Sequence, residues 1–164
     1  MITGFDLTPL LKKRVDAKLG YATNEGLILK GMHVPIKVFV AADNGFPLPD
    51  YCFFTTDKGF TKDRSEIKGF LKAAAAGWQA ARADPGAAAS AVIALQAGAK
   101  RAETVKEISL DTRNFIMGPN APGPLFAVAP PSIDTVSALL LKVGFIKKPV
   151  PASDIYDGSL VPAK

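Results

Sequence analysis

Five consecutive residues, Tyr21 to Glu25, combine side chains that can hold a small polar ring. The Tyr21 ring can stack on a flat ligand, the Asn24 amide can donate and accept hydrogen bonds, and the Glu25 carboxylate can accept them. Thr23 adds a hydroxyl group to the same run. The run follows a segment that we predict as a strand, and ligands of open α/β sheets bind outside the carboxyl ends of strands. It is our first candidate binding site; the alternative is that Thr23 or Asn24 caps the following helix and the other side chains face solvent.

A second group of polar side chains surrounds the next crossover in the chain. Asp43 and Asn44 open this crossover, and Tyr51 closes it. The same reasoning about strand ends makes these three residues further ligand-binding candidates, on a weaker basis because they are more widely spaced.

Residues for metal binding or nucleophilic catalysis are scarce. His33 is the only histidine and Cys52 the only cysteine, which excludes a multi-histidine site and an intramolecular disulfide. We expect His33 to follow a helix end and meet exposed carbonyl groups, and Cys52 to be a buried, inert thiol in an apolar strand. Neither a phosphate-binding glycine loop nor a nucleophile elbow occurs. We therefore expect no metal and no catalytic residue.

The elements that position these residues are three short strands followed by a mostly helical remainder. Thr8 is expected to cap the first helix, Asp63 and Glu66 have the spacing of a capping box, and Trp78 falls on the apolar face of the longest helix. We predict strands over 15–21, 35–42 and 51–56, a helix after Asn24 that ends near Gly31, helices over 9–14, 63–84, 85–96, 102–116 and 131–143, and a turn near Asp154.

Three strands make a thin sheet for so many helices, because a typical sheet has about 5–6. The chain is therefore either a small α+β domain or the C-terminal part of a larger α/β protein. Its length of 164 residues fits one domain. We expect no membrane-spanning helix, since five prolines interrupt the longest uncharged stretch, 114–133. We also see no signal peptide, so the chain is cytosolic or begins downstream of an export signal.

The net charge of +5 is spread over small basic clusters that are not interleaved with aromatic residues. This arrangement is unlike a nucleic-acid-binding surface. We therefore expect no nucleic-acid partner.

Several runs of the sequence, in this order, resemble the SsuA/THI5-like (NMT1/THI5) solute-binding proteins of ABC importers. They are V-D-A, G-Y-A-T-N-E, the D-N-G turn, F-F-T-T, the G-W pair inside a helix, and the closing G-F-I-K-K-P-V-P-A-S-D-I-Y-D-G-S-L-V. The resemblance covers nearly the whole chain. It implies an α/β fold of the periplasmic-binding-protein type II-like class, present only in part, with few strands and mostly helices in the C-terminal two thirds.

The resemblance also implies a division of the chain and a function. Residues 1–42 would be the remnant of a second lobe, 43–50 the hinge crossover, and 51–164 the return to the first lobe with the C-terminal helices. The chain would bind a small aromatic or heteroaromatic nutrient, such as a thiamine-precursor pyrimidine, or else a sulfonate, and deliver it to a membrane permease without a cofactor or chemistry of its own. Its location would be periplasmic, or exported and membrane-associated.

Two other functions remain open at this stage. Fungal members that resemble this family synthesise the thiamine pyrimidine, so the chain can also be a fragment of such an enzyme, although His33 is not in a matching motif. It can also be a helical scaffold that binds no ligand. Because strand faces made for an absent lobe would be exposed, we expect the isolated fragment to self-associate.

Overall fold

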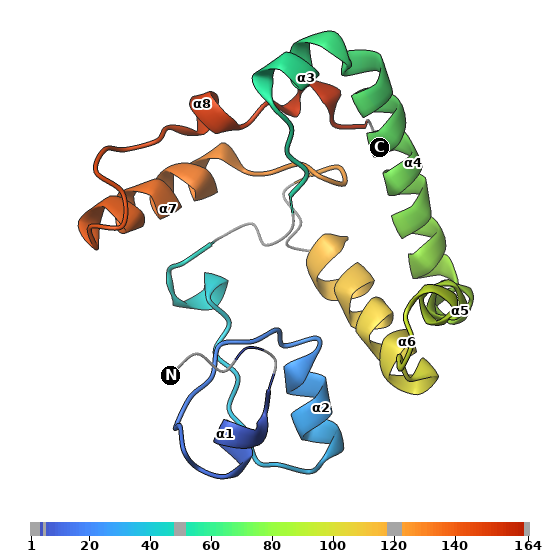
Figure 1. Cartoon of the computed structure of the whole chain (residues 1–164). Helices are drawn as coiled ribbons and strands as arrows, with labels where there is room; N and C mark the ends of the chain where they lie inside the picture. Colours follow the sequence, from blue (N-terminus) through green and yellow to red (C-terminus); the bar gives the residue numbers. More distant parts are fainter. Residues whose placement is uncertain (1–3, 5, 48–51, 118–122, 163–164) are drawn as a thin grey trace.

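The computed structural model describes residues 4, 6–47, 52–117 and 123–162 (Figure 1). Within these residues it is built from helices joined by extended and irregular segments. In chain order they are α1 (Thr8–Leu11), α2 (Glu25–Gly31), the 3-10 turn η1 (Ala42–Asn44), α3 (Asp57–Lys62), α4 (Arg64–Ala83), α5 (Pro85–Leu95), α6 (Arg101–Leu110), the π-helix η2 (Asp111–Ile116), α7 (Pro130–Lys142), α8 (Ala152–Ile155) and the 3-10 turn η3 (Gly158–Leu160).

The three predicted strands are wrong for the part of the chain that the structure describes. Residues 15–21, 35–40 and 52–56 lie outside any helix and outside any strand, and 41–42 belong to a turn and to η1. A strand forms only when its backbone N–H and C=O groups pair with a neighbouring strand, and these segments do not pair with one another. The apolar, β-branched pattern therefore does not lead to paired strands in these residues. The α/β class is therefore not seen in the described residues.

Helices α4, α5 and α6 pack against one another and form the best-defined part of the fold (Figure 1). The predicted apolar face of α4 is only partly covered, because Leu71 is buried whereas Trp78 is half-buried and Phe70 is 55% exposed. We expected Trp78 in the core, so that prediction is wrong. Small side chains fill the remaining contacts, with Ala75 of α4, Ala89 of α5 and Thr104 of α6 buried.

The ends of these helices follow local chemistry, with three differences from expectation. Thr8 is the first residue of α1 rather than its cap, and its N–H donates to Asp6 Oδ1 at 2.9 Å. Asp63 is at the N-cap of α4 but makes no side-chain cap bond. Asp84, which we did not predict as a cap, accepts from the Ala87 N–H at 2.9 Å and starts α5 ahead of Pro85.

Three helices end in the same backbone arrangement, a Schellman motif. The residue after the C-cap is left-handed in each: Lys13 (φ 53°) after α1, His33 (φ 56°) after α2 and Gly144 (φ 74°) after α7. The N–H of His33 donates to the Lys30 carbonyl at 3.0 Å, and that of Val34 to the Leu29 carbonyl at 3.0 Å. His33 therefore meets helix-end carbonyls as expected, and does so through its backbone.

The C-terminal segment is held on α7 by polar contacts. The Ala152 N–H donates to Asp134 Oδ1 at 2.8 Å, and the Val150 N–H donates to Ser137 Oγ at 2.8 Å. Within the described residues, the buried apolar side chains are few and spread over the chain: Leu29, Leu71, Ala75, Ala89, Val136, Ala152 and Leu160. The fold is therefore open, and its extended segments keep much apolar surface in contact with water.

Candidate functional site

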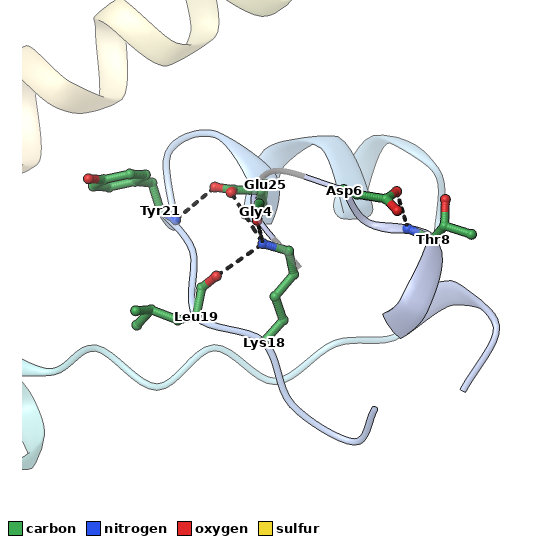
Figure 2. Close-up of polar contacts among 7 residues, drawn as sticks. All are labelled: Gly4, Asp6, Thr8, Lys18, Leu19, Tyr21 and Glu25. Carbon is green, nitrogen blue, oxygen red and sulfur yellow. Dashed lines mark hydrogen bonds and ion pairs between the residues drawn. The ribbon is translucent and has the colours of Figure 1, made fainter. Parts of the chain in front are cut away.

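The Glu25 carboxylate lies at the first residue of α2 and points back toward the segment that precedes the helix (Figure 2). Its Oε2 accepts the Tyr21 N–H at 2.8 Å, and its Oε1 is 3.6 Å from Lys18 Nζ. The side chains of Lys18 and Glu25 are only 4% and 8% exposed. A carboxylate at a helix N-terminus is favoured by the helix dipole, and here it also neutralises a buried ammonium.

Two hydrogen bonds and one ion pair hold the Lys18 ammonium group inside this cluster. Its Nζ lies 2.7 Å from the Gly4 carbonyl oxygen and 3.1 Å from the Leu19 carbonyl oxygen, in addition to the Glu25 carboxylate (Figure 2). An ammonium group has three N–H donors and no acceptor. The cluster is therefore self-satisfied, and it closes the N-terminal loop onto the start of α2.

Gly20 allows the carboxylate to approach the backbone closely. A Cβ atom added at this position would lie 3.0 Å from Glu25 Cδ and 3.1 Å and 3.2 Å from the two carboxylate oxygens. These distances are shorter than ordinary van der Waals contact. The absence of a side chain at Gly20 therefore leaves the space that the Glu25 carboxylate occupies.

The other residues of the first candidate cluster have different surroundings. Thr23 is buried, and Asn24 Nδ2 donates to Glu107 Oε1 of α6 at 2.9 Å. Neither side chain caps α2, so the alternative in which Thr23 or Asn24 caps this helix is wrong. Tyr21 is 39% exposed, and its ring is directed away from the Glu25 carboxylate (Figure 2). The ring is the part of this cluster that a ligand can reach from solvent.

The second candidate cluster lies on the surface. Asp43 and Asn44 form part of η1 and are exposed, and Asn44 Nδ2 donates to the Val40 carbonyl at 2.8 Å. Among the described residues, no hydrogen bond or ion pair joins them to the Tyr21–Glu25 segment. Tyr51 and the end of the expected hinge crossover, 48–50, lie outside the described residues.

Cys52 is exposed, which contradicts the expectation of a buried thiol. The prediction assumed a strand inside a sheet covered on both faces, and the segment that carries Cys52 is not part of a sheet. Within the described residues, no three histidine, cysteine or acidic side chains gather as a metal-binding group. None of the described helices combines the length and apolar character needed to cross a membrane.

A family model described as NMT1/THI5 like matches residues 1–88, slightly more than half of the chain. The chain belongs to the NMT1/THI5-like family. The resemblance inferred from the sequence is thereby confirmed at the level of the family.

No curated protein and no solved structure matched the chain. The NMT1/THI5-like family has a fold of the periplasmic-binding-protein type II-like class, and a mostly helical chain fits part of that fold. The family includes both solute-binding proteins of ABC importers and thiamine-pyrimidine synthases.

The matched region contains every candidate ligand-binding residue. It also contains two residues that position Glu25 and that the sequence reasoning missed, Lys18 and Gly20. A single lysine and a single glycine in V-D-A-K-L-G-Y carry no spacing signal of their own. Only the fold of the loop shows that both serve the Glu25 carboxylate.

Proposed function

We propose that this member of the NMT1/THI5-like family is a solute-binding component of an ABC importer. In this proposal it captures a small nutrient, hands it to a membrane permease, and does no chemistry. It works outside the cytoplasm, in the periplasm or attached to the outer side of the membrane. Family membership supports the general class, and the Tyr21–Glu25 cluster supports the kind of solute.

The charges of the cluster favour an amino-bearing heteroaromatic ring over a sulfonate. A sulfonate needs an accessible cationic donor, but the Lys18 side chain is only 4% exposed, donates to the Gly4 and Leu19 carbonyls and is paired with Glu25. The Glu25 carboxylate, by contrast, has lone pairs beyond the one that accepts from the Tyr21 N–H. Ring amino groups of an aminopyrimidine are donors that suit this acceptor.

In the bound state, the Tyr21 side chain, which points away from the Glu25 carboxylate in the free chain, turns to stack on the pyrimidine, and Glu25 accepts from the amino group of the pyrimidine. Thr23 and Asn24 shape the wall behind the carboxylate, and Asn24 anchors this wall to α6 through Glu107. Since the Glu25 carboxylate is nearly buried, the ligand reaches it only where the ring of Tyr21 borders solvent. The observation that carries the proposal is the buried Glu25 carboxylate, which bonds the backbone N–H of Tyr21, a residue whose side chain is partly exposed.

Calorimetric titration of the chain with three probes tests the proposal. We expect heat with an aminopyrimidine, at least about tenfold weaker binding of the matching hydroxypyrimidine, and no heat with an alkanesulfonate. Tyr21→Ala should weaken aminopyrimidine binding by about three- to tenfold. Phe145→Ala removes another exposed aromatic ring, 81% exposed and located after α7, and should leave the affinity unchanged.

Two results would contradict this function. Equal binding of the sulfonate and the aminopyrimidine would show that the Glu25 carboxylate does not select the solute. A complete absence of heat with all three probes, in a chain whose helical circular dichroism is intact, would remove the case for solute binding.

A further inference from the structure

Residues 142–148, called here the α7 tip, begin at the last residue of α7 and form the turn that follows it. The turn combines exposed apolar side chains with positive charge. Val143 is 74% exposed and Phe145 is 81% exposed. On both sides of them in the sequence stand exposed basic residues, which are Lys142, Lys147 and Lys148. The α7 tip thus presents two apolar side chains to water within a positively charged segment.

The backbone of the α7 tip is fixed by the way in which α7 ends. The Gly144 N–H donates to the Leu141 carbonyl at 3.0 Å, and the Phe145 N–H donates to the Leu140 carbonyl at 2.9 Å. In a Schellman motif, an apolar residue at the position of Phe145 frequently packs on the last turn of its own helix. Phe145 instead remains largely exposed. The motif therefore holds an aromatic side chain in a defined place without covering it.

The chain is also anchored directly after the α7 tip. The Val150 N–H donates to Ser137 Oγ and the Ala152 N–H donates to Asp134 Oδ1, both at 2.8 Å, so the chain returns to α7. Both ends of the turn are thus held by hydrogen bonds before any partner is present. Binding through a turn of this kind requires little further ordering of the backbone.

The α7 tip lies at the periphery of the molecule. Figure 1 shows the end of α7 at the left edge, apart from α4, α5 and α6. Among the described helices, α7 contacts only α8. An extended surface can therefore reach the turn from outside.

The positive charge of the α7 tip is not balanced by its surroundings. The stretch 135–153 contains the three lysines and no acidic residue. Within the described residues, no ion pair, hydrogen bond or cation-π contact involves the ammonium groups of these lysines. The turn is therefore complementary to a negatively charged surface.

The other two basic clusters of the chain have acidic neighbours. Lys100 Nζ is 3.4 Å from Glu103 Oε1. The cluster at 12–14 stands between Asp6 and Asp16 in the sequence, and the charge of Lys12 contributes to lowering the pKa of Asp6. Unbalanced charge together with two strongly exposed apolar side chains is thus a property of the α7 tip.

We propose that the α7 tip binds the surface of an anionic lipid bilayer. Val143 and Phe145 enter the boundary between the head groups and the acyl chains, and the lysines lie against the lipid phosphates. Apolar burial and electrostatic attraction add to each other in this mode of binding. The inference does not depend on the solute-binding function proposed above, since it concerns a different surface.

A bilayer suits the α7 tip better than a nucleic acid does. Single-stranded nucleic acids bind along a groove in which several aromatic side chains stack on successive bases. The α7 tip has one aromatic ring, at Phe145, and its other strongly exposed apolar side chain is the aliphatic Val143. An aliphatic side chain offers nothing for a base to stack on, but it can enter the acyl region of a bilayer.

Co-sedimentation of the whole chain with lipid vesicles tests the proposal. One set of vesicles is phosphatidylcholine alone, and the other contains equal parts of phosphatidylcholine and phosphatidylglycerol. At about 0.05 M salt, we expect binding to the anionic vesicles that is at least about tenfold tighter than to the neutral ones. Raising the salt to about 0.5 M should remove most of this difference, because the charges are then screened.

Two triple variants separate the position of the charges from their number. Each lysine near an anionic surface contributes about fivefold to the affinity, so replacing all three lysines of the α7 tip with glutamine should weaken binding roughly hundredfold. The matched control removes the same net charge from exposed lysines of α3 and α4, as Lys58→Gln/Lys62→Gln/Lys68→Gln. The control should change the affinity by less than about threefold, since these lysines are far from the bound turn.

The apolar contribution has its own pair of variants. Phe145→Ala should weaken binding to the anionic vesicles by about tenfold, because most of the ring leaves water when the turn inserts. Leu95→Ala is the control, since Leu95 lies at the end of α5 and is 91% exposed. It should leave vesicle binding unchanged.

Hydrogen exchange of the unmodified chain gives a measurement that does not depend on the folding of a variant. Anionic vesicles should slow the exchange of amides within 142–148 and leave those of α5 and α6 unchanged. Unchanged exchange at 142–148 in a chain that does bind the vesicles would place the contact elsewhere and overturn the proposal.

Three further outcomes would overturn it. One is the absence of binding to anionic vesicles at low salt. Another is an equal loss of affinity in the two triple lysine variants, which would show that only net charge matters. The third is binding to a single-stranded oligonucleotide that is as tight as binding to the anionic vesicles and equally sensitive to Phe145→Ala, because the turn would then recognise polyanions in general.

Discussion

Replacing Glu25 with glutamine isolates the charge of the buried carboxylate. Glutamine has nearly the same shape, and its side-chain oxygen can still accept the Tyr21 N–H that now bonds at 2.8 Å. What the variant loses is the negative charge 3.6 Å from Lys18 Nζ, in a pair whose side chains are 4% and 8% exposed. The lysine is then left as a buried cation without a counter-charge.

The loss of stability expected for Glu25→Gln follows from the burial of the Lys18–Glu25 pair. Removal of one partner of a buried ion pair destabilises a protein by about 3–5 kcal/mol. Lys18 keeps the carbonyl oxygens of Gly4 and Leu19 at 2.7 Å and 3.1 Å, which satisfy two of its donors. We therefore expect the lower end of the range, a loss of about 3 kcal/mol in the free energy of unfolding.

The chain contains a matched control in the pair of Lys100 and Glu103. Their charged atoms are closer, at 3.4 Å, but the side chains are 75% and 58% exposed. Exposed pairs contribute about 0–1 kcal/mol, so Glu103→Gln should cost less than about 0.5 kcal/mol. If only the distance between the charged atoms mattered, Glu103→Gln would cost more stability than Glu25→Gln.

Urea denaturation followed by circular dichroism measures both variants under the same conditions. A double-mutant cycle adds Lys18→Met and the Lys18→Met/Glu25→Gln pair. Because the double variant leaves no buried charge unpaired, we expect it to lose less stability than the two single losses together, with a coupling of about 2 kcal/mol. Equal losses for Glu25→Gln and Glu103→Gln, or simple additivity in the cycle, would refute the reasoning.

Three further predictions concern single positions. Gly20→Ala should push the Glu25 carboxylate aside and cost about 1 kcal/mol in urea denaturation, a loss that should vanish when Glu25 is alanine. His33→Gly should raise the free energy of unfolding by about 0.5–1 kcal/mol in thermal denaturation, because the left-handed backbone there suits glycine; a lowered melting temperature would contradict this. The side-chain and backbone hydrogen bonds of Ser159 lower the pKa of Asp157, so Ser159→Ala should raise that pKa in a carboxyl NMR titration. A carboxyl group whose pKa is lower in the folded state than in the unfolded state stabilises the fold above the unfolded pKa, and this stabilisation is lost as the pH falls through the folded pKa. The Ser159→Ala variant should therefore lose part of this stabilisation. An unchanged pKa of Asp157 would contradict the assignment.

The helices could be predicted from sequence because their signals are local. Asp84 and Pro85 end one helix and start the next within two residues, and the observed bounds of α4 and α5 lie close to the predicted ones. The same holds for α7, where the predicted start at Pro131 differs by one residue from the observed start at Pro130. Side-chain caps could not be predicted as well as helix bounds. Asp63 and Asp84 each stand directly before a helix, but only Asp84 accepts a backbone N–H there.

The strands could not be settled in this way, because a strand depends on a partner that is distant in sequence. Phe53 and Phe54 favour a strand, but nothing in their types says which neighbouring strand would pair with them. The candidate site shows the same limit. The contact of Asn24 with Glu107 joins residues 83 positions apart, and no spacing rule within the Tyr21–Glu25 run predicts it.

The buried pair gives the candidate site a physical role that the sequence alone does not indicate. A flexible loop that carries Tyr21 would have to be ordered when a ligand binds, at a cost of about 0.5–1.5 kcal/mol for each side chain that becomes fixed. Lys18 and Glu25 order this loop beforehand, by joining its carbonyl groups and the Tyr21 N–H to the start of α2. Under the proposed function, Glu25 therefore acts twice: it accepts a hydrogen bond from the solute, and it fixes the backbone of Tyr21 before the solute binds.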